Sequence, residues 1–266
     1  KMATFDLNNF VIDHVLRGLM VSSSTGEVMW SINQITEPQL SITTESADAV
    51  DALGSKIASF YRSKNAEFTG TNSLFDLGLY AAQNGTTKAV ASTDAKLTVP
   101  AFETLTVGST NTEVILKHTP KTAPTAVYLL KGDGTLGEKI SYSSTAGTGK
   151  FTYDSTAQKI TLPDSAKAGE QYFVNYEYDA ERAVSVTGDA INFPKAGKFY
   201  MEVLGTDVCN QTDLIHAFVV FPNAKLKADV DVSFTTDGTH PFTIEANQSY
   251  CDNQKTLFQI IVPDEE

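Results

Sequence analysis

Histidine is the side chain best suited to acid–base catalysis near neutral pH, but the four histidines of this 266-residue sequence are not placed for it. A catalytic histidine needs a nucleophile or a carboxylate within reach, and the sequence has no nucleophile-elbow, P-loop, zinc-protease or dinucleotide-binding motif. The apolar run around His216 predicts a core or pore-side residue, and "DGTHPF" predicts that His240 lies in a turn. The other two are His14 and His118. We therefore expect a protein that is not an enzyme.

Cysteines and acidic loops are the remaining features that could bind a metal ion. Cys209 and Cys251 have no CxxC spacing and no histidine at ligand spacing. We interpret them as small buried thiols, with pairing across neighbouring strands as the alternative. The loops "KGDGTLGE" and "TTDGTHP" lack the alternating carboxylates of a calcium site. We expect neither a metal ion nor any other cofactor.

Two charged clusters could instead attract or repel another molecule. In "KADVDVSF", Asp229 and Asp231 would share one face of a strand, because successive side chains alternate. Lys56, Arg62 and Lys64 form a basic cluster in an otherwise acidic chain. A solvated surface is the simplest interpretation of each cluster. The alternatives are a repeated band of carboxylates in a symmetric assembly, and a contact of the basic cluster with an acidic neighbour such as the "PDEE" end of another copy.

The overall charge excludes one class of partner. The net charge is −12, and residues 186–266 contribute most of it, with 5 basic and 12 acidic residues. Such a protein is poorly suited to gripping nucleic acid, because binding needs cations that displace phosphate counterions. It could still surround nucleic acid without gripping it. No apolar run approaches the length of a membrane span and no signal-peptide pattern is present, so we expect no membrane insertion.

Short β-rich apolar runs separated by turn signals dominate the sequence, which predicts a mainly β fold. In residues 102–185 the runs follow one another regularly, with Asp133-Gly134 as a hairpin signal, and their spacing suits a small sandwich of immunoglobulin-like size. The most apolar runs lie in residues 186–266. We expect residues 1–101 and 186–266 to form one β-sandwich or barrel, with residues 102–185 inserted as a small β-sandwich.

One short helix interrupts the β pattern, within "EFTGTNSLFDLGLYAAQNG". Ser73 followed by Asp76 resembles a capping box, and Asn84-Gly85 is a helix stop signal. The residues between them leave little polar face, so the helix must be covered on more than one side. The preceding segment, "SADAVDALGSKIASFYRSK", is ambiguous, and we interpret it as a long excursion that is partly helical or extended.

This layout resembles that of bacteriophage tail tube, or major tail, proteins. The resemblance lies in "ITEPQLSITTESADAVDALGSKIASFYRSKNAEFTG" with the following "LFDLGLYAAQNG", and in "KFYMEVLGTD" and "HAFVVFPNAKLKADVDVSFTTDGTHPFTIEA". It covers residues 1–101 and 186–266, and an immunoglobulin-like insertion fits residues 102–185. No residue signature defines the family, so the resemblance is one of layout.

The resemblance implies a virion structural protein. Its copies would form stacked hexameric or trimeric rings around a channel for DNA passage during genome ejection, after assembly in the host bacterial cytoplasm. Its partners would be other copies, other tail proteins and, transiently, DNA. A polar, negatively charged sheet face would line the channel and repel DNA phosphates, so that the genome slides without sticking, and Lys56, Arg62 and Lys64 would contact the next ring. The candidate lining residues are Asp229, Asp231, Asp237 and Glu245.

Three alternatives to a tail tube remain open at this point. The same β texture would suit a capsid decoration protein or a tail-terminator protein. A third alternative is a carbohydrate-binding β-module. Tyr172, Tyr176 and Tyr178 lie at strand spacing and could form a platform for a sugar, or could be half-buried sandwich residues.

Overall fold

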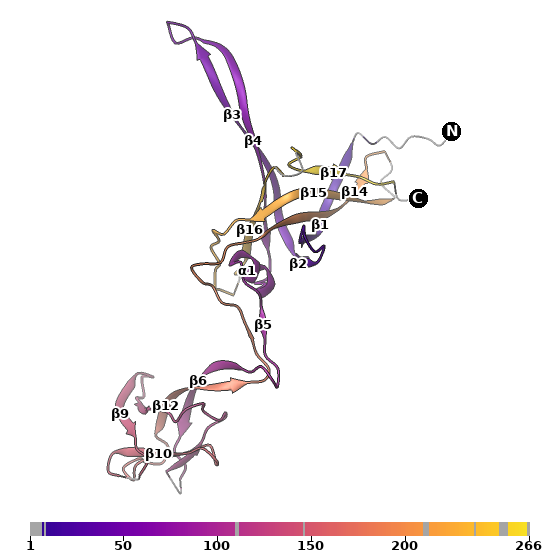
Figure 1. Ribbon diagram of the computed structural model, residues 1–266. Helices are drawn as coiled ribbons and strands as arrows, with labels where there is room; N and C mark the ends of the chain where they lie inside the picture. The colour runs from indigo at the N-terminus through magenta and orange to yellow at the C-terminus, as the bar shows by residue number, and fades with distance from the viewer. Residues whose placement is uncertain are drawn as a thin grey trace. The chain divides into compact units, whose positions relative to one another are not determined.

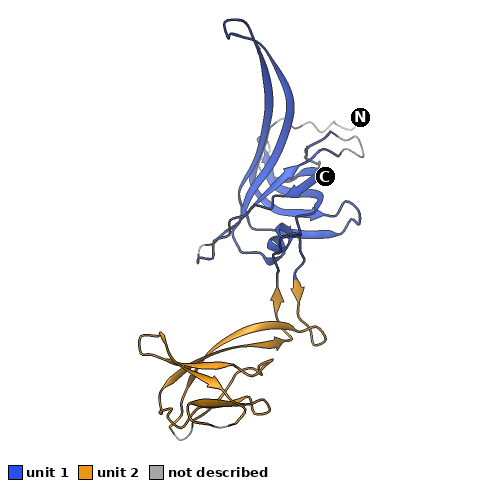
Figure 2. Ribbon diagram, turned by 60° about the vertical axis from the view of Figure 1, so that its left-hand side comes forward, with its two compact units in different colours: residues 1–88, 186–266 blue, residues 89–185 orange. Residues whose placement is uncertain are grey.

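The protein is built from strands, and its chain divides into two compact units (Figure 2). The computed structural model describes residues 7, 9–109, 112–145, 147–209, 213–236, 238–249 and 255–264. Unit 1 comprises residues 1–88 and 186–266, and unit 2 comprises residues 89–185. Strands make up most of the described chain, which contains a single helix, α1. The prediction of a mainly β fold is therefore confirmed.

Eight strands of unit 1 form one antiparallel sheet (Figure 1). Their order across the sheet is β2 (Val28–Ile32), β1 (Phe10–Val21), β14 (Ala196–Asp207), β15 (Leu214–Leu226), β16 (His240–Ala246), β4 (Lys56–Asn72) and β3 (Ile35–Val50), with β17 (Gln259–Ile261) also paired to β15. The strands β2 and β3 therefore form the two edges of the sheet.

Alternation of side chains gives this sheet one apolar and one polar face. On β14, Phe199, Met201 and Val203 are buried, whereas Tyr200 and Glu202 between them are partly exposed. The same two-residue period recurs on the inner part of β4 and on β16. The apolar face is the one packed against the core of unit 1, as expected for an antiparallel sheet with one solvated side.

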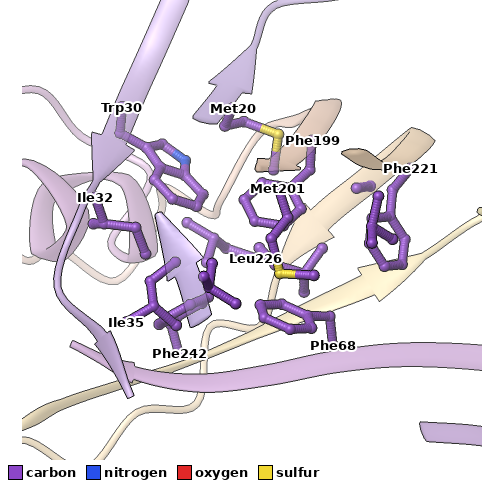
Figure 3. Close-up of a cluster of buried hydrophobic side chains, with 14 of the residues drawn as sticks. Met20, Trp30, Ile32, Ile35, Phe68, Phe199, Met201, Phe221, Leu226 and Phe242 are labelled. Atoms are coloured by element: carbon purple, nitrogen blue, oxygen red, sulfur yellow. The ribbon is translucent and has the colours of Figure 1, made fainter. Parts of the chain in front are cut away.

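The sheet curls around its aromatic core (Figure 3). The ring centroids of Trp30 on β2 and Phe242 on β16 lie 6.5 Å apart, although three strands separate β2 from β16 in the sheet. Phe68 and Phe199 lie between them, with centroids 6.0 Å apart. Strands that are not neighbours in the sheet thus meet across the core, which produces a half-barrel.

The helix α1 (Leu77–Gln83) packs on the core face of this half-barrel, where Leu79 is fully buried. It ends as predicted, because Asn84 caps it and Gly85 follows with a φ of 66°. It begins later than predicted. Asp76 is the N-cap, and its Oδ1 accepts a 2.8 Å hydrogen bond from the Leu79 amide. Ser73 instead belongs to the preceding turn, where its amide donates to the carbonyl of Gln34.

The segment of ambiguous pattern is entirely extended. β3 and β4 pair from Ile35 and Asn72 to Val50 and Lys56, with a tight turn at residues 51–55. Only residues 67–72 of β4 also pair with β16. Residues 43–65 therefore form a two-stranded ribbon that extends beyond the sheet, and we call this ribbon the arm (Figure 1). Of the two interpretations left open by the sequence, the extended one is confirmed, because pairing with the partner strand outweighed the local helical spacing.

Unit 2 has its own sheet and core. β5 (Ala89–Val90) pairs with β13 (Val184–Ser185), next to the two chain crossings into unit 1. The seven remaining strands are, in sheet order, β6 (Leu97–Thr106), β12 (Gln171–Ala180), β8 (Ala126–Leu130), β9 (Leu136–Tyr142), β10 (Lys150–Asp154), β11 (Lys159–Thr161) and β7 (Glu113–Ile115). The first boundary lies at 88/89 where the sequence suggested 101/102, because β6 pairs with β12 along its whole length. The immunoglobulin-like character of this unit stays a prediction.

The position of the helix cap can be tested by two substitutions. Asp76→Ala should lower the free energy of unfolding of unit 1 by about 1 kcal/mol, because it leaves an amide of the first turn without an acceptor. Ser73→Ala should have almost no effect. Urea denaturation followed by the fluorescence of Trp30, the only tryptophan in the chain, would measure both values. Equal losses in the two variants would mean that the helix is capped at Ser73.

Candidate functional site

The arm exposes more large apolar side chains than a solvated ribbon needs. Leu53 at its tip is 92% exposed, Ile57 is 69% exposed and Tyr61 is 76% exposed. Val50 and Phe60 are also exposed. A two-stranded ribbon is only marginally stable alone in water, and both of its edges present unpaired backbone groups. The arm is therefore a surface suited to contact with another chain.

The basic cluster predicted from the sequence lies on the arm, but its members differ. The Lys56 ammonium lies 3.1 Å from the Asp48 carboxylate, so this charge is already paired within the hairpin. Hydrogen bonds from Ser59 and then Lys56 lower the pKa of Asp48. Arg62 lies at an irregularity of the strand pairing, and both Arg62 and Lys64 are exposed. Among the described residues, neither makes an ion pair, so these two are the members available to a partner.

Of the three predicted lining residues that the structure describes, only Glu245 lies on the polar face of the sheet. It occupies β16 beside Glu67 of β4, and both carboxylates lie 3.6 Å from the ammonium of Lys227. Further along this face, Glu202 of β14 pairs with Arg17 of β1 and lies 2.8 Å from His216 of β15.

The polar face therefore carries paired charges rather than a band of carboxylates. His216 belongs to this face and not to the core. The position of the Glu202 carboxylate, in contact with basic groups on both neighbouring strands, is a feature that periodicity in the sequence did not reveal.

The other lining candidates do not lie on a strand. β15 ends at Leu226 and β16 begins at His240, so Asp229 and Asp231 lie in an irregular segment between them. Both are exposed, as the solvated interpretation predicted, but they do not share a strand face. Asp237 lies outside the described residues. The β-rich letters of "KADVDVSF" were misleading because no neighbouring strand pairs with this segment among the described residues.

A groove of about 910 Å³ runs beside α1, between the helix and the β1–β2 hairpin. Its apolar lining includes Trp30, Ala81 and Ala82, and the exposed Val28, Phe75 and Leu77 are among the residues that line it. Lys88 and Lys195 also line it, and neither forms an ion pair within the described part of the chain. Periodicity could not have revealed this groove, because its walls are far apart along the chain.

His240 attaches α1 to the sheet and so fixes one wall of the groove. Its ring is fully buried at the start of β16, with Nε2 2.7 Å from Gln83 Oε1. Its Nδ1 accepts a 3.4 Å hydrogen bond from the Asp76 amide. This set of partners requires a neutral ring with its proton on Nε2. Burial lowers the pKa of His240, against a smaller opposite effect of Asp76. The prediction of a turn residue was wrong.

The three tyrosines at strand spacing do not form a platform for a sugar in unit 2. Tyr172 and Tyr176 are buried in the core, and only Tyr178 is partly exposed, stacked on His118 at a centroid distance of 3.9 Å. Burial and the neighbouring Glu170 raise the pKa of Tyr172 to about 12.

The buried Tyr176 has a structural role in this unit. Its hydroxyl contacts the buried carboxylate of Glu103 and accepts a hydrogen bond from the His118 amide, and Glu103 also accepts from the Lys117 amide. Burial and Glu103 raise the pKa of Tyr176. These contacts fix the segment after β7, so the tyrosine row is explained by packing.

The described residues contain no metal-binding cluster of three or more histidine, cysteine or acidic side chains. Cys209 is exposed, contrary to the expectation of a buried thiol, and Cys251 lies outside the described residues. Within the described ranges, no helix is long and apolar enough to cross a membrane.

The buried state of His240 predicts a dependence of stability on pH. Because its folded pKa lies below the unfolded value, the unfolded chain takes up a proton first as pH falls. The free energy of unfolding of unit 1 should therefore be intact above the unfolded pKa and decrease between about pH 7 and pH 5. His240→Gln should flatten this slope, whereas His14→Gln, at an exposed position, should not. Urea titrations at about pH 7 and pH 5, followed by the fluorescence of Trp30, would measure this pH dependence of the free energy of unfolding. An unchanged slope in His240→Gln would contradict the assignment of the pH dependence to His240.

Comparison with known proteins agrees with the layout of the chain. The family described as the YomU/Tube protein family matches residues 10–261, a span that includes unit 2 and most of unit 1. This match confirms the resemblance to phage tail tube proteins. No curated protein matches the sequence.

Proposed function

Because the chain belongs to the YomU/Tube protein family, a family of phage tail tube proteins, we propose that it polymerises into stacked rings that form the tail tube. In this proposal the protein is a structural subunit of the virion tail and performs no catalysis. Its partners are other copies of itself, other tail proteins and the DNA that passes through the channel. Assembly takes place in the cytoplasm of the host bacterium.

The arm is the observation that supports polymerisation most directly. It carries five exposed large apolar side chains over residues 43–65, and no third strand pairs with it among the described residues. Each large apolar side chain that becomes buried contributes about 1.5–3 kcal/mol, so a partner that covers several of them offsets the cost of association. Another copy of the same chain is a partner that is present wherever the protein is made.

The sheet edges support lateral association into a ring. β2 and β3 each pair with a single neighbouring strand, so their outer edges present backbone groups that another strand can pair with. Closed rings remove such edges, and a repeated contact between two different surfaces closes into a ring when the rotation allows. Three or six copies per ring are the arrangements that we propose.

We propose that the polar sheet face lines the channel. DNA phosphates would then meet carboxylates and basic groups side by side, as in the groups Glu67–Lys227–Glu245 and Arg17–Glu202. A balanced surface neither grips phosphates through free cations nor needs strong repulsion to let DNA slide. Asp229 and Asp231 stay candidates for an acidic contribution to this lining.

A capsid decoration or tail-terminator protein is the second candidate function, because such proteins also self-associate. Negative-stain microscopy of the purified chain separates the two, since a tube protein forms filaments with a hollow axis. Trimers, single rings or monomers at high concentration would favour the second candidate.

Shortening the arm should abolish polymers without unfolding the subunit. Replacing residues 45–63 by Asn-Gly would join Thr44 to Lys64, which already face each other across the hairpin. The variant should keep the unfolding transition of Trp30 and remain monomeric in sedimentation and microscopy. A Lys131→Ala variant, changed in unit 2, should polymerise normally. Tubes formed by the shortened protein would contradict a role of the arm.

Chemical labelling can test the orientation of the polar face. In a chain with Cys209→Ser and Cys251→Ser, Glu245→Cys should react with a small maleimide but not with a large polyethylene glycol maleimide in intact tubes. Both reagents should label it after the tubes are dissolved in urea. Leu136→Cys, exposed on unit 2, should react with both reagents in either state. Labelling of Glu245→Cys by the large reagent in intact tubes would place this face outside the channel.

A further inference from the structure

Unit 1 carries two surfaces that expose large apolar side chains, one projecting and one recessed. One is convex: the arm tip, residues 50–57, where Val50, Leu53 and Ile57 are 57%, 92% and 69% exposed. The other is concave: the groove of about 910 Å³ beside α1, in whose lining Val28 and Leu77 are 59% and 38% exposed. Each surface leaves apolar area in water that the other could cover.

The arm tip cannot reach the groove of its own subunit. β4 runs from the tip at Lys56 to Asn72, and α1 begins five residues later at Leu77. Its 17 residues, at a rise of about 3.3 Å each, separate the two surfaces by about 50 Å. Figure 1 shows the arm tip and α1 at opposite ends of β4. Only another copy can therefore bring a tip into the groove.

The charged residues around the two surfaces restrict the orientation in which they could dock. Asp51 lies at the arm tip, where its Oδ1 accepts hydrogen bonds from the amides of Leu53 and Ser55. Its carboxylate faces no basic partner in the described chain, and Lys88 and Lys195 of the groove lining have no acidic one. The acidic Glu27 and Asp76 also line the groove, so a docked Asp51 carboxylate is favoured only in an orientation that places it beside Lys88 or Lys195.

The groove is held in shape before any partner arrives. His240 and the Asp76 cap fix the start of α1, and Gly85 lies so close to the backbone of Phe193 that an added Cβ would be 2.2 Å from its carbonyl oxygen. A rigid receiving surface loses little conformational entropy on binding. The two ends of the contact thus have separate roles, an extended insert and a fixed receptor.

We propose that the arm tip of one copy docks in the α1 groove of a copy in the next ring, with Leu53 as the central apolar contact. This inference rests on the proposed function and names the two surfaces of the axial contact. Because insert and receptor lie at opposite ends of β4, every docked copy still offers a vacant groove or a vacant tip. Such a heterologous contact repeats without closing along the axis, which is what a tube requires.

Disulfide trapping between separate copies tests the contact. In the Cys209→Ser, Cys251→Ser background, protein with Leu53→Cys is mixed with protein carrying Val28→Cys or Leu77→Cys, assembled and oxidised. Both mixtures should give covalent dimers on non-reducing gels. The matched mixture with Ile12→Cys, which is 64% exposed on β1 outside the groove, should not. A chain carrying both Leu53→Cys and Leu77→Cys should give a ladder of higher multimers.

Microscopy of the same samples separates the two ways to fail. Tubes without dimers in the groove mixtures would overturn this inference and leave the proposed function standing. Dimers of Leu53→Cys protein alone, in amounts equal to the mixtures, would show that tips meet tips and would also overturn it. If no tubes form, the proposed function fails, and the inference fails with it.

Discussion

The need of backbone N–H and C=O groups for hydrogen-bond partners is the constraint on which the rest of this molecule depends. Every N–H and C=O group of a strand needs a partner, and a ribbon of two strands satisfies only the groups between them. In the half-barrel, five strands of unit 1 have neighbours on both sides. Residues 56–66 of β4, in contrast, pair with no described strand on the β16 side. In a single copy an arm of this length leaves these backbone groups to water, and the proposed assembly would cover them.

The core of unit 1 explains how such an arm can project from a rigid base. Trp30, Phe68, Phe199 and Phe242 pack across a curled sheet, so the inner part of the hairpin is anchored on one face. The helix then covers the core face, attached through His240 and Gln83 rather than through a broad apolar contact alone. One buried histidine therefore links the position of α1, and with it the groove, to the first residue of β16.

Charge in this protein has to be considered locally. The net charge of −12 suggests repulsion of DNA, yet the carboxylates on the polar sheet face stand beside Lys227, Arg17 and His216. Ion pairs at this degree of exposure contribute little to stability. Their effect lies in the surface they present, which is polar and close to neutral over the distance that separates neighbouring phosphates.

Local sequence signals determined the mainly β fold, the end of the helix at Asn84-Gly85 and the family resemblance, because these depend on residues close together in the chain. Tertiary structure decided the rest. Residues 46–64 have partly helical spacing but are extended, because β3 and β4 pair with each other. The N-cap of α1 is Asp76 rather than Ser73. Asp229 and Asp231 lie in a segment that pairs with no described strand, whereas Glu67 of β4 and Glu245 of β16 both lie beside Lys227, the residue after the end of β15. Such contacts arise from register between distant strands, which periodicity in one segment does not encode.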